Sequence, residues 1–419
     1  MMRREPLTPP LLASLAAPLA GLLLASGCAG APPPPEVPAA VAPTAPPAAS
    51  GDATPPVASS AATAAPPPVA TFSIPRPPPP AEPLAPLTRT FTTVKLPGVK
   101  RSIVSVEGRG PNDLWFMTYE EQTDQYARTV GGDVLHYDGK RIKSHGHPCP
   151  YSMFGGIVVS GDAVVALGYR PWSRGVAPSF RASLVKDSTW NCEEDRGGYS
   201  AGITTTSGDH VWELSCRSDD CRLEASGGPS VPLPSDHPSF DAKKQDAPDA
   251  IQAIWMRGLD DGWMVRSGDD GRSWLLRYNG VTWTAVAPLE EGMYGNGLWA
   301  EGNDVWILVG WSADDGLATD LLRYDGRSFS YVPVPKGFST RRVRGASGRD
   351  LWFSGAGKAL YQWDGAALHQ GEGPFEVDDL WAGPGGEVWL VGPPTDNGGP
   401  PAGTVARALP LPAAGKVTP

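Results

Sequence analysis

Short apolar runs separated by polar turns recur along residues 89–419, and their length of four to eight residues predicts strands rather than helices. An Asp-x-Trp motif, or a variant of it, marks one strand in each of seven units, at Trp115, Val165, Trp212, Trp263, Trp306, Trp352 and Trp389. These positions are about 46 residues apart on average, a spacing typical of repeats that each form one small sheet. Because the six tryptophans recur in phase, we expect them to pack between the repeats.

Four of the units also carry a second turn signal downstream of the tryptophan. An aromatic residue followed by Asp-Gly or Asn-Gly ends at Gly139, Gly280, Gly326 and Gly365. These dipeptides favour two-residue hairpins, in which both central residues take positive φ. With one strand before the tryptophan and one after the turn, each unit has four antiparallel strands, which is the composition of a propeller blade.

The two ends of the array predict how it closes. The seventh unit has no fourth strand after 404–409, whereas an unpaired strand-like run, Phe91 to Pro97, precedes the first unit. We therefore expect the amino-terminal strand to complete the last blade and remove the open edges of a linear array. The sequence predicts an all-β, seven-bladed β-propeller over residues 89–412, followed by a flexible tail at 413–419.

The first 88 residues have a different composition. They hold 24 of the 47 prolines but none of the 15 tryptophans, and they are rich in alanine. Such a segment cannot bury a core, so residues 28–88 are predicted to be a disordered Pro/Ala-rich tether.

The amino terminus has the pattern of an export signal. Arg3 and Arg4 precede an apolar stretch from Leu11 to Leu24 that is too short to span a membrane. The following residues, Leu24-Ala25-Ser26-Gly27-Cys28, resemble the lipobox of bacterial lipoproteins. This resemblance implies that 1–27 is a signal peptide, that Cys28 is lipidated, and that the lipid holds the protein in the outer membrane, on its periplasmic face or at the cell surface.

The formal net charge of −10 at pH 7 makes nucleic acid an improbable partner, since phosphate binding needs a basic face. Four cysteines remain after Cys28, and an exported protein permits disulfides. Cys216 and Cys221 flank a predicted turn and should lie opposite each other. Cys149 and Cys192 follow the fourth strands of neighbouring units and should meet at the rim between them.

No metal or cofactor is predicted. The run His145-Gly146-His147-Pro148-Cys149 contains metal-ligand types, but no second ligand cluster stands at a regular spacing. The acidic turns at Asp260, Asp269 and Asp314 lack the alternating carboxylates of a calcium-binding loop, so we interpret them as hairpin turns.

The repeats resemble the Asp-Val-Trp and aromatic-Asp-Gly propellers of secreted and lipid-anchored bacterial proteins, whose molecular function is usually undefined. One unit also matches the Asp-box of a broader propeller group, through Ser267, Asp269, Gly271, Ser273 and Trp274. In families that carry it, this box is a structural hairpin turn remote from any active centre.

The resemblance raises a glycosidase-like, sialidase-type alternative. Only one clear box is present, however, and Arg341, Arg342 and Arg344 lie in one strand, where side chains alternate between faces instead of converging from separate blades. No pair of carboxylates can be singled out for glycoside hydrolysis.

We therefore expect a monomeric, non-catalytic module that binds or scaffolds an envelope protein, with carbohydrate binding as the alternative. Trp172 and Trp311, in predicted loops, are the candidate binding surface.

Overall fold

The computed structural model describes residues 78–79, 84–120, 130–149, 153–169, 179–186, 189–194, 198–207, 210–217, 220–225, 228–233, 251–268, 270–311, 319–393 and 399–410. All of them belong to the compact unit that runs from Pro67 to Pro419. The predicted signal peptide with Cys28, most of the predicted tether and the predicted tail lie outside the described residues.

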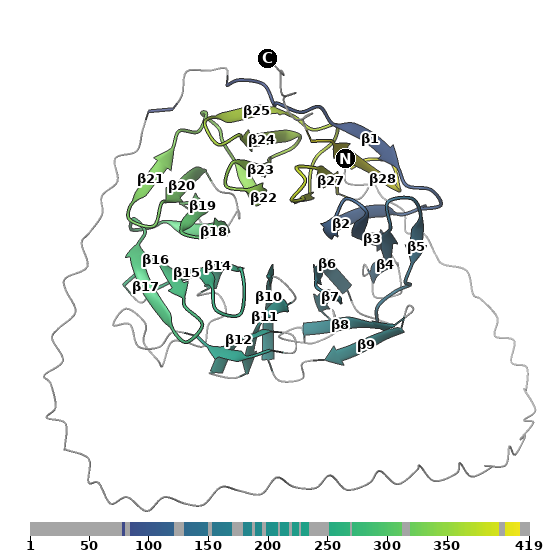
Figure 1. The fold of residues 1–419 in the computed structure, drawn as a ribbon, viewed down its shortest axis with the longest axis horizontal. Coiled ribbons are helices and arrows are strands. Elements are labelled where there is room, and N and C mark those ends of the chain that lie inside the picture. The colour runs from purple at the N-terminus through teal and green to yellow at the C-terminus, as the bar shows by residue number, and fades with distance from the viewer. Residues whose placement is uncertain are drawn as a thin grey trace, which may run out of the picture. The chain divides into compact units, whose positions relative to one another are not determined.

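The described residues form seven antiparallel sheets of four strands each, as the sequence predicts (Figure 1). Blades 1 to 3 comprise β2 (Ser102–Gly110), β3 (Asp113–Glu120), β4 (Val130–Tyr137), β5 (Ile142–Ser144), β6 (Met153–Ser160), β7 (Ala163–Tyr169), β8 (Ser179–Lys186), β9 (Thr189–Glu194), β10 (Gly198–Ser207), β11 (His210–Arg217), β12 (Asp220–Ala225) and β13 (Ser230–Pro232).

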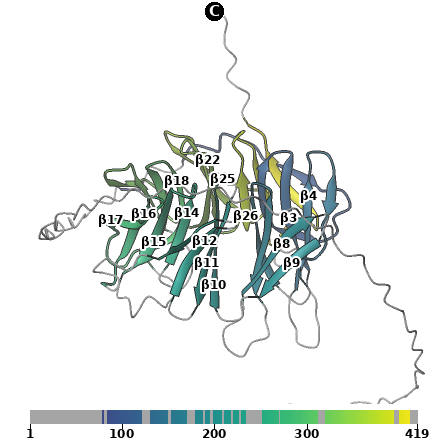
Figure 2. The same cartoon turned by 60° about the horizontal axis from the view of Figure 1, so that its bottom comes forward.

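Blades 4 to 7 follow in the same order around the ring. They comprise β14 (Ile251–Met256), β15 (Gly262–Ser267), β16 (Ser273–Tyr278), β17 (Trp283–Pro288), β18 (Tyr294–Glu301), β19 (Asp304–Gly310), β20 (Asp320–Tyr324), β21 (Phe329–Val332), β22 (Thr340–Ser347), β23 (Asp350–Gly355), β24 (Ala359–Trp363), β25 (Leu368–Glu372), β26 (Asp379–Ala382), β27 (Val388–Val391), β28 (Thr404–Ala408) and β1 (Thr92–Lys95). The first strand of each blade lies toward the centre of the ring, and Figure 2 shows the blades side by side around it.

The amino-terminal strand closes the ring as predicted. The seventh sheet has the order β1-β28-β27-β26, and β1 pairs with β28 from Thr92 opposite Arg407 to Lys95 opposite Thr404. The last blade is therefore built from both ends of the array, so unfolding any part of it opens the ring.

Contacts begin earlier than the boundary expected at residue 89. Residues 84–91, named here the strap, run along the outer strand of blade 6, where Pro86 pairs in parallel with Gln370 and the Gln370 N–H donates to the Ala85 carbonyl at 2.9 Å. Leu87 packs over Gly371, at which a Cβ would lie only 2.8 Å from the leucine side chain. Glycine at 371 is therefore what lets the strap approach.

The core lies between the blades, and the six in-phase tryptophans are all in it. Trp212, Trp306, Trp352 and Trp389 are among the largest fully buried side chains, and Trp115 and Trp263 are buried as well. Each packs with the strands of a neighbouring blade, as Trp306 does with Leu351, Phe353 and Tyr361 of blade 6. The prediction that these residues are packing residues is confirmed.

The aromatic-Asp-Gly turns are centred one residue later than the two-residue hairpins predicted. Gly139, Gly280, Gly326 and Gly365 do take positive φ, between 89° and 94°. The preceding Asp or Asn closes the turn instead of sitting at its centre, since its N–H donates to the carbonyl three residues on, as from Asp364 to Ala367 at 3.2 Å. Its side-chain oxygen then accepts the N–H groups of the second and third residues after it, as Asp364 does from Ala366 and Ala367, which is the Asx-turn geometry.

Asp364 provides a test of this turn by pH. The N–H of Ala367, together with His369 and Ala366, lowers the pKa of Asp364 to about 2, below the ordinary 3.8. Because the pKa is lower in the folded state, the carboxylate stabilises the fold above about pH 4, and this contribution disappears as the pH falls toward 2. Asp364→Ala should therefore lose stability in urea at pH 7, with the deficit shrinking between pH 4 and 2.5. A deficit that is constant with pH would contradict this.

Candidate functional site

In three blades the acid of the Asp-x-Trp motif, or of its variant, binds the tryptophan of the same motif, whereas the Trp263 indole N–H donates to the Gly302 carbonyl at 3.1 Å. Asp113 accepts the Trp115 indole N–H at 3.0 Å, Asp350 accepts that of Trp352 at 3.0 Å, and Glu387 accepts that of Trp389 at 2.6 Å. A buried indole needs such a partner. The motif therefore serves the packing of the blades.

An arginine covers the same tryptophan in four blades, and a histidine does so in a fifth. Arg277, Arg323, Arg407 and Arg89 lie 4.5 to 5.5 Å from the ring centroids of Trp263, Trp306, Trp389 and Trp352, and His136 stacks on Trp115 at 4.3 Å. The arginine or histidine normally stands opposite the tryptophan on the third strand of the blade. In blade 6 that place is taken by Gln362, and Arg89 of the strap supplies the cation and an ion pair with Asp350 at 2.7 Å.

Removing one cation tests the energetic role of these clusters. Arg277 stacks on Trp263 and pairs with Asp261 at 2.7 Å. Arg277→Gln should lower the free energy of unfolding by about 1 kcal/mol, less at high salt, because the pair is partly exposed. Arg327→Gln, which removes an exposed turn arginine, is the matched control and should cost nothing measurable. Equal losses from the two variants would contradict a specific role for the cluster.

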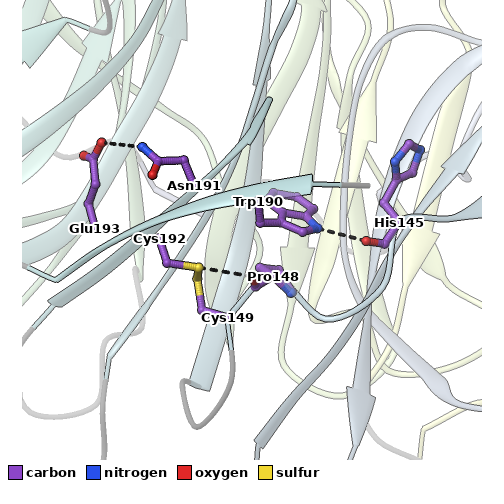
Figure 3. Close-up of a disulfide and its surroundings, with 7 residues drawn as sticks. All are labelled: His145, Pro148, Cys149, Trp190, Asn191, Cys192 and Glu193. Carbon is purple, nitrogen blue, oxygen red and sulfur yellow. Dashed lines mark hydrogen bonds between the residues drawn. A yellow bond between two sulfur atoms is a disulfide. The ribbon is translucent and has the colours of Figure 1, made fainter. Parts of the chain in front are cut away.

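A disulfide joins Cys149 and Cys192, as the sequence predicts (Figure 3). Cys149 follows β5 of blade 1 and Cys192 lies in β9 of blade 2, so the bond connects neighbouring blades. Beside it, the Trp190 indole N–H donates to the His145 carbonyl at 2.9 Å. The run from His145 to Cys149 is thus joined to β9 of the next blade by a disulfide and a hydrogen bond.

Cys216 and Cys221 face each other in the register of β11 and β12. Their side chains lie outside the described residues, so the disulfide between them stays a prediction.

The described members of the Asp-box form the turn between β15 and β16. Gly271 has a φ of 76°, the Ser273 hydroxyl donates to the Met293 carbonyl at 2.5 Å, and Trp274 is buried. The Ser267 hydroxyl accepts from the Gln252 amide at 2.6 Å. Asp269 lies outside the described residues. The neighbouring Asp270 accepts the Arg272 N–H at 3.1 Å and the Trp274 indole N–H at 3.4 Å.

Of the two tryptophans proposed as a binding surface, Trp172 lies outside the described residues. Trp311 follows β19 and its side chain is 44% exposed. Its indole N–H donates to Asp320 at 2.9 Å, so the exposed ring is fixed in orientation.

A charged cluster at the centre of the ring was not predicted from the sequence. The inner-strand cluster, as we name it, comprises Ser105 and Glu107 of β2, Arg342 and Arg344 of β22, and Asp379 of β26. These strands belong to blades 1, 6 and 7, which are adjacent around the ring (Figure 1).

Asp379 makes the largest number of hydrogen bonds and ion pairs in the inner-strand cluster. It is buried, and it accepts the Ser105 hydroxyl at 2.9 Å, the Val106 N–H at 3.2 Å and the Leu380 N–H at 3.0 Å, with Arg342 Nη1 at 3.2 Å. Four donors thus satisfy this carboxylate, as a buried charge requires. Because they come from three blades, Asp379 holds the cluster together.

Glu107 is the second carboxylate. Burial raises its pKa to about 7, assisted by Asp379 and opposed by Arg344, Arg342 and the Gly108 N–H. Glu107 therefore changes charge around neutral pH, whereas the arginines stay charged. Strongly shifted groups of this kind concentrate at functional sites.

Arg342 and Arg344 are two residues apart in β22, so their side chains share a face of the strand. A register shift between Thr340 and Arg342 interrupts the pairing of β22 with β23. The arginines do come from one strand, as expected, yet they meet carboxylates from two other blades. Opposite the Asp-x-Trp tryptophan, the inner strands carry Trp255, Trp299 and Trp381 in three blades, but Glu107 and Arg344 in two others. That substitution of charge for tryptophan is the signal that could have revealed the site.

Within the described ranges, no group of three or more His, Cys, Asp or Glu side chains is arranged to hold a metal ion. The same part of the chain contains no helix with the length and apolar character needed to cross a bilayer.

No family model matches the sequence, and no curated protein matches it. Solved structures do match the fold. A streptogramin B lyase is 13% identical, over 76% of this chain and 97% of its own, with a TM-score of 0.50. Virginiamycin B lyase from Staphylococcus aureus is 10% identical, over 77% and 100%, with a TM-score of 0.50, and YCF48 bound to D1 peptide is 11% identical, over 78% and 100%, with a TM-score of 0.49. At these identities the likeness shows the propeller fold alone.

Proposed function

We propose that this protein is a non-catalytic, protein-binding module of the cell envelope, anchored in the outer membrane by a lipid on Cys28. The observation that carries the binding role is the inner-strand cluster. Packing of the blades is served elsewhere by the Asp-x-Trp clusters, whereas Arg342 keeps 43% of its side chain exposed at a place where three blades meet. A fixed, partly exposed arginine is a typical anchor for a partner.

The arrangement favours binding over hydrolysis. Asp379 is buried and already accepts four donors, so its oxygens are occupied within the protein and Glu107 is the other carboxylate of the cluster. Glycoside hydrolysis requires two carboxyl groups that act together, one as an acid and one as a nucleophile or base. The cluster does not supply that pair.

Export is supported by the bond between Cys149 and Cys192, since such disulfides persist in oxidising compartments. Lipidation is tested by labelling cells with an alkyne fatty acid. The wild-type chain should take up label and fractionate with outer membranes, and Cys28→Ser should do neither. Unlabelled wild-type protein would overturn the anchor.

The binding role is tested by crosslinking the tagged protein in intact cells of its own source. Wild type and Arg327→Gln should give the same crosslinked protein, and Arg342→Gln/Arg344→Gln should lose it. If the double variant gives the same product in the same yield, the cluster is not the binding site. If purified protein instead releases a chromogenic sugar, the non-catalytic role is wrong.

Carbohydrate binding is the second candidate, and the fixed, exposed ring of Trp311 favours it. On a glycan array, binding that is abolished by Trp311→Ala and retained by Arg342→Gln would establish it. Absence of any glycan signal would remove this alternative.

A further inference from the structure

We infer that the inner-strand cluster binds carboxylate groups of an acidic protein segment, with Arg342 and Arg344 as the anion-binding residues. This inference rests on the proposed protein-binding function and specifies the chemistry of the partner.

Arg342 and Arg344 each have N–H donors beyond those used within the cluster. A guanidinium group has five N–H donors, and Arg342 uses one nitrogen, Nη1, for Asp379. Arg344 donates from Nη1 to the Val343 carbonyl at 3.2 Å. Since the two arginines are two residues apart on β22, they share a face of the strand and present their remaining donors together. The planar fork of such groups matches a carboxylate in a bidentate manner.

Arg342 is held in one orientation by its ion pair. Asp379 orients Arg342, and the other three donors to Asp379 fix that carboxylate in turn. Asp379 is therefore a positioning residue, and Arg342 is ordered before any ligand arrives. Such preorganisation reduces the entropic cost of binding.

Two buried hydroxyl groups lie in the strands around Arg342. Ser354 lies directly opposite it in the pairing of β22 with β23, and this side chain is 1% exposed. Within the described structure its hydroxyl has no hydrogen-bond partner, and neither has that of the fully buried Thr340 on β22. The strands that carry and flank Arg342 therefore bring polar groups into the interior of the blade, where an unpaired hydroxyl is costly.

The position that Arg342 occupies in blade 6 is taken by small residues in three other blades. In blade 6, Arg342 is the inner-strand residue that pairs with the position two residues after the tryptophan. The equivalent inner-strand residue, counted from Val165 in blade 2 and from the tryptophan in blades 4 and 5, is Gly156, Ala253 and Gly297, respectively. A Cβ built on Gly156 would meet no atom within 4 Å. Gly156 therefore leaves open space beside its strand at this level of the ring, whereas a Cβ on Gly297 would lie 3.1 Å from the Leu308 side chain.

The net charge of the inner-strand cluster depends on the protonation of Glu107. With Glu107 ionised, the two arginines are balanced by two carboxylates, and with Glu107 protonated the cluster carries a net positive charge. The charged groups that act on Glu107 are Arg342 and Arg344 of β22 and Asp379 of β26. On β3 the residue opposite is Trp115, and the described side chains of β6 from 156 to 160 bring no ionisable group. Protonation of Glu107 should therefore strengthen the binding of a carboxylate.

The test is titration calorimetry of the full chain in detergent with three capped peptides. These are hexaglutamate with an amidated carboxyl end, hexaglutamine with a free carboxyl end, and hexaglutamine amidated. Hexaglutamate should bind, Arg342→Gln should weaken it at least tenfold, and Arg327→Gln should leave it unchanged. Binding by hexaglutamine with the free carboxyl end alone would identify a chain terminus, not acidic side chains, as the source of the carboxylate and would overturn the inference of an acidic segment.

The pH arm uses Glu107→Gln. Wild-type affinity for hexaglutamate should rise about fivefold or more from pH 8 to pH 6, and Glu107→Gln should bind tightly at both values. Asp379 remains satisfied by Ser105, Val106 and Leu380 in Arg342→Gln, so that variant should fold, and a cooperative urea transition like that of wild type, at the same or a slightly lower midpoint, confirms this. No hexaglutamate binding, or equal binding by Arg342→Gln, overturns the inference. If crosslinking still recovers a partner in that case, the proposed protein-binding function stands without it.

Discussion

Cys149→Ala/Cys192→Ala is expected to lower the free energy of unfolding by about 2 to 4 kcal/mol. The bond closes a segment with a sequence separation of 43 residues, which includes strands β6 to β8 and connects blades 1 and 2. Losing the bond enlarges the unfolded ensemble, and this entropic gain grows with the length of the closed segment. Urea unfolding of the variant and of wild type under oxidising conditions measures the difference.

The control for this experiment is Cys216→Ala/Cys221→Ala. The segment between these cysteines is only four residues long, so its loss should cost clearly less. Thiol titration of the denatured, unreduced Cys28→Ser protein should find no free thiol if both bonds form and two if only Cys149 and Cys192 pair. Four free thiols, or equal stability of wild type and Cys149→Ala/Cys192→Ala, would contradict the expected role.

The number of blades followed from the sequence because packing between blades repeats. Trp306 and Trp352 are buried by equivalent neighbours in successive blades, so the same residue type recurs in phase. The turn glycines recur for the same reason, since Gly326 and Gly365 meet the same backbone requirement. The predicted centre of the turn was wrong by one residue, because the dipeptide alone does not show which of its two residues forms the last backbone hydrogen bond between the strands.

The candidate site could not be predicted in the same way, because its residues differ from those at the equivalent positions of the other blades. Glu107 and Asp379 are more than 270 positions apart in sequence, and neither stands in a motif. They come together only because the ring brings blade 1 beside blade 7. The strap was missed for a related reason. Its proline-rich composition is that of the tether. Its contacts are with the outer strand of blade 6, which is distant in sequence, so no local sequence pattern predicts them.

The largest effect is expected from opening the ring at its amino-terminal strand. A chain that begins at Gly98 lacks β1 and the strap, and it should lose about 5 kcal/mol or more, which is comparable with the whole stability of many domains. Leu96 alone is 2% exposed and contributes about 2 kcal/mol by burial, and Phe91 packs edge-on against Trp352 at 5.4 Å. The exposed edge of β28 should also promote aggregation.

Two further starting points separate the contributions of β1 and the strap. A chain that begins at Leu84 keeps every described contact of both and should unfold at the same urea concentration as wild type. One that begins at Thr92 keeps β1 but loses the ion pair of Arg89 with Asp350 and the cation over Trp352, so its midpoint should fall between the other two. Because β1 supplies the ladder along β28, the step from Thr92 to Gly98 should be the larger one. If the chain beginning at Gly98 is as stable as the one beginning at Leu84, the seventh blade does not need its amino-terminal strand, and closure of the ring rests on the contacts between blades alone.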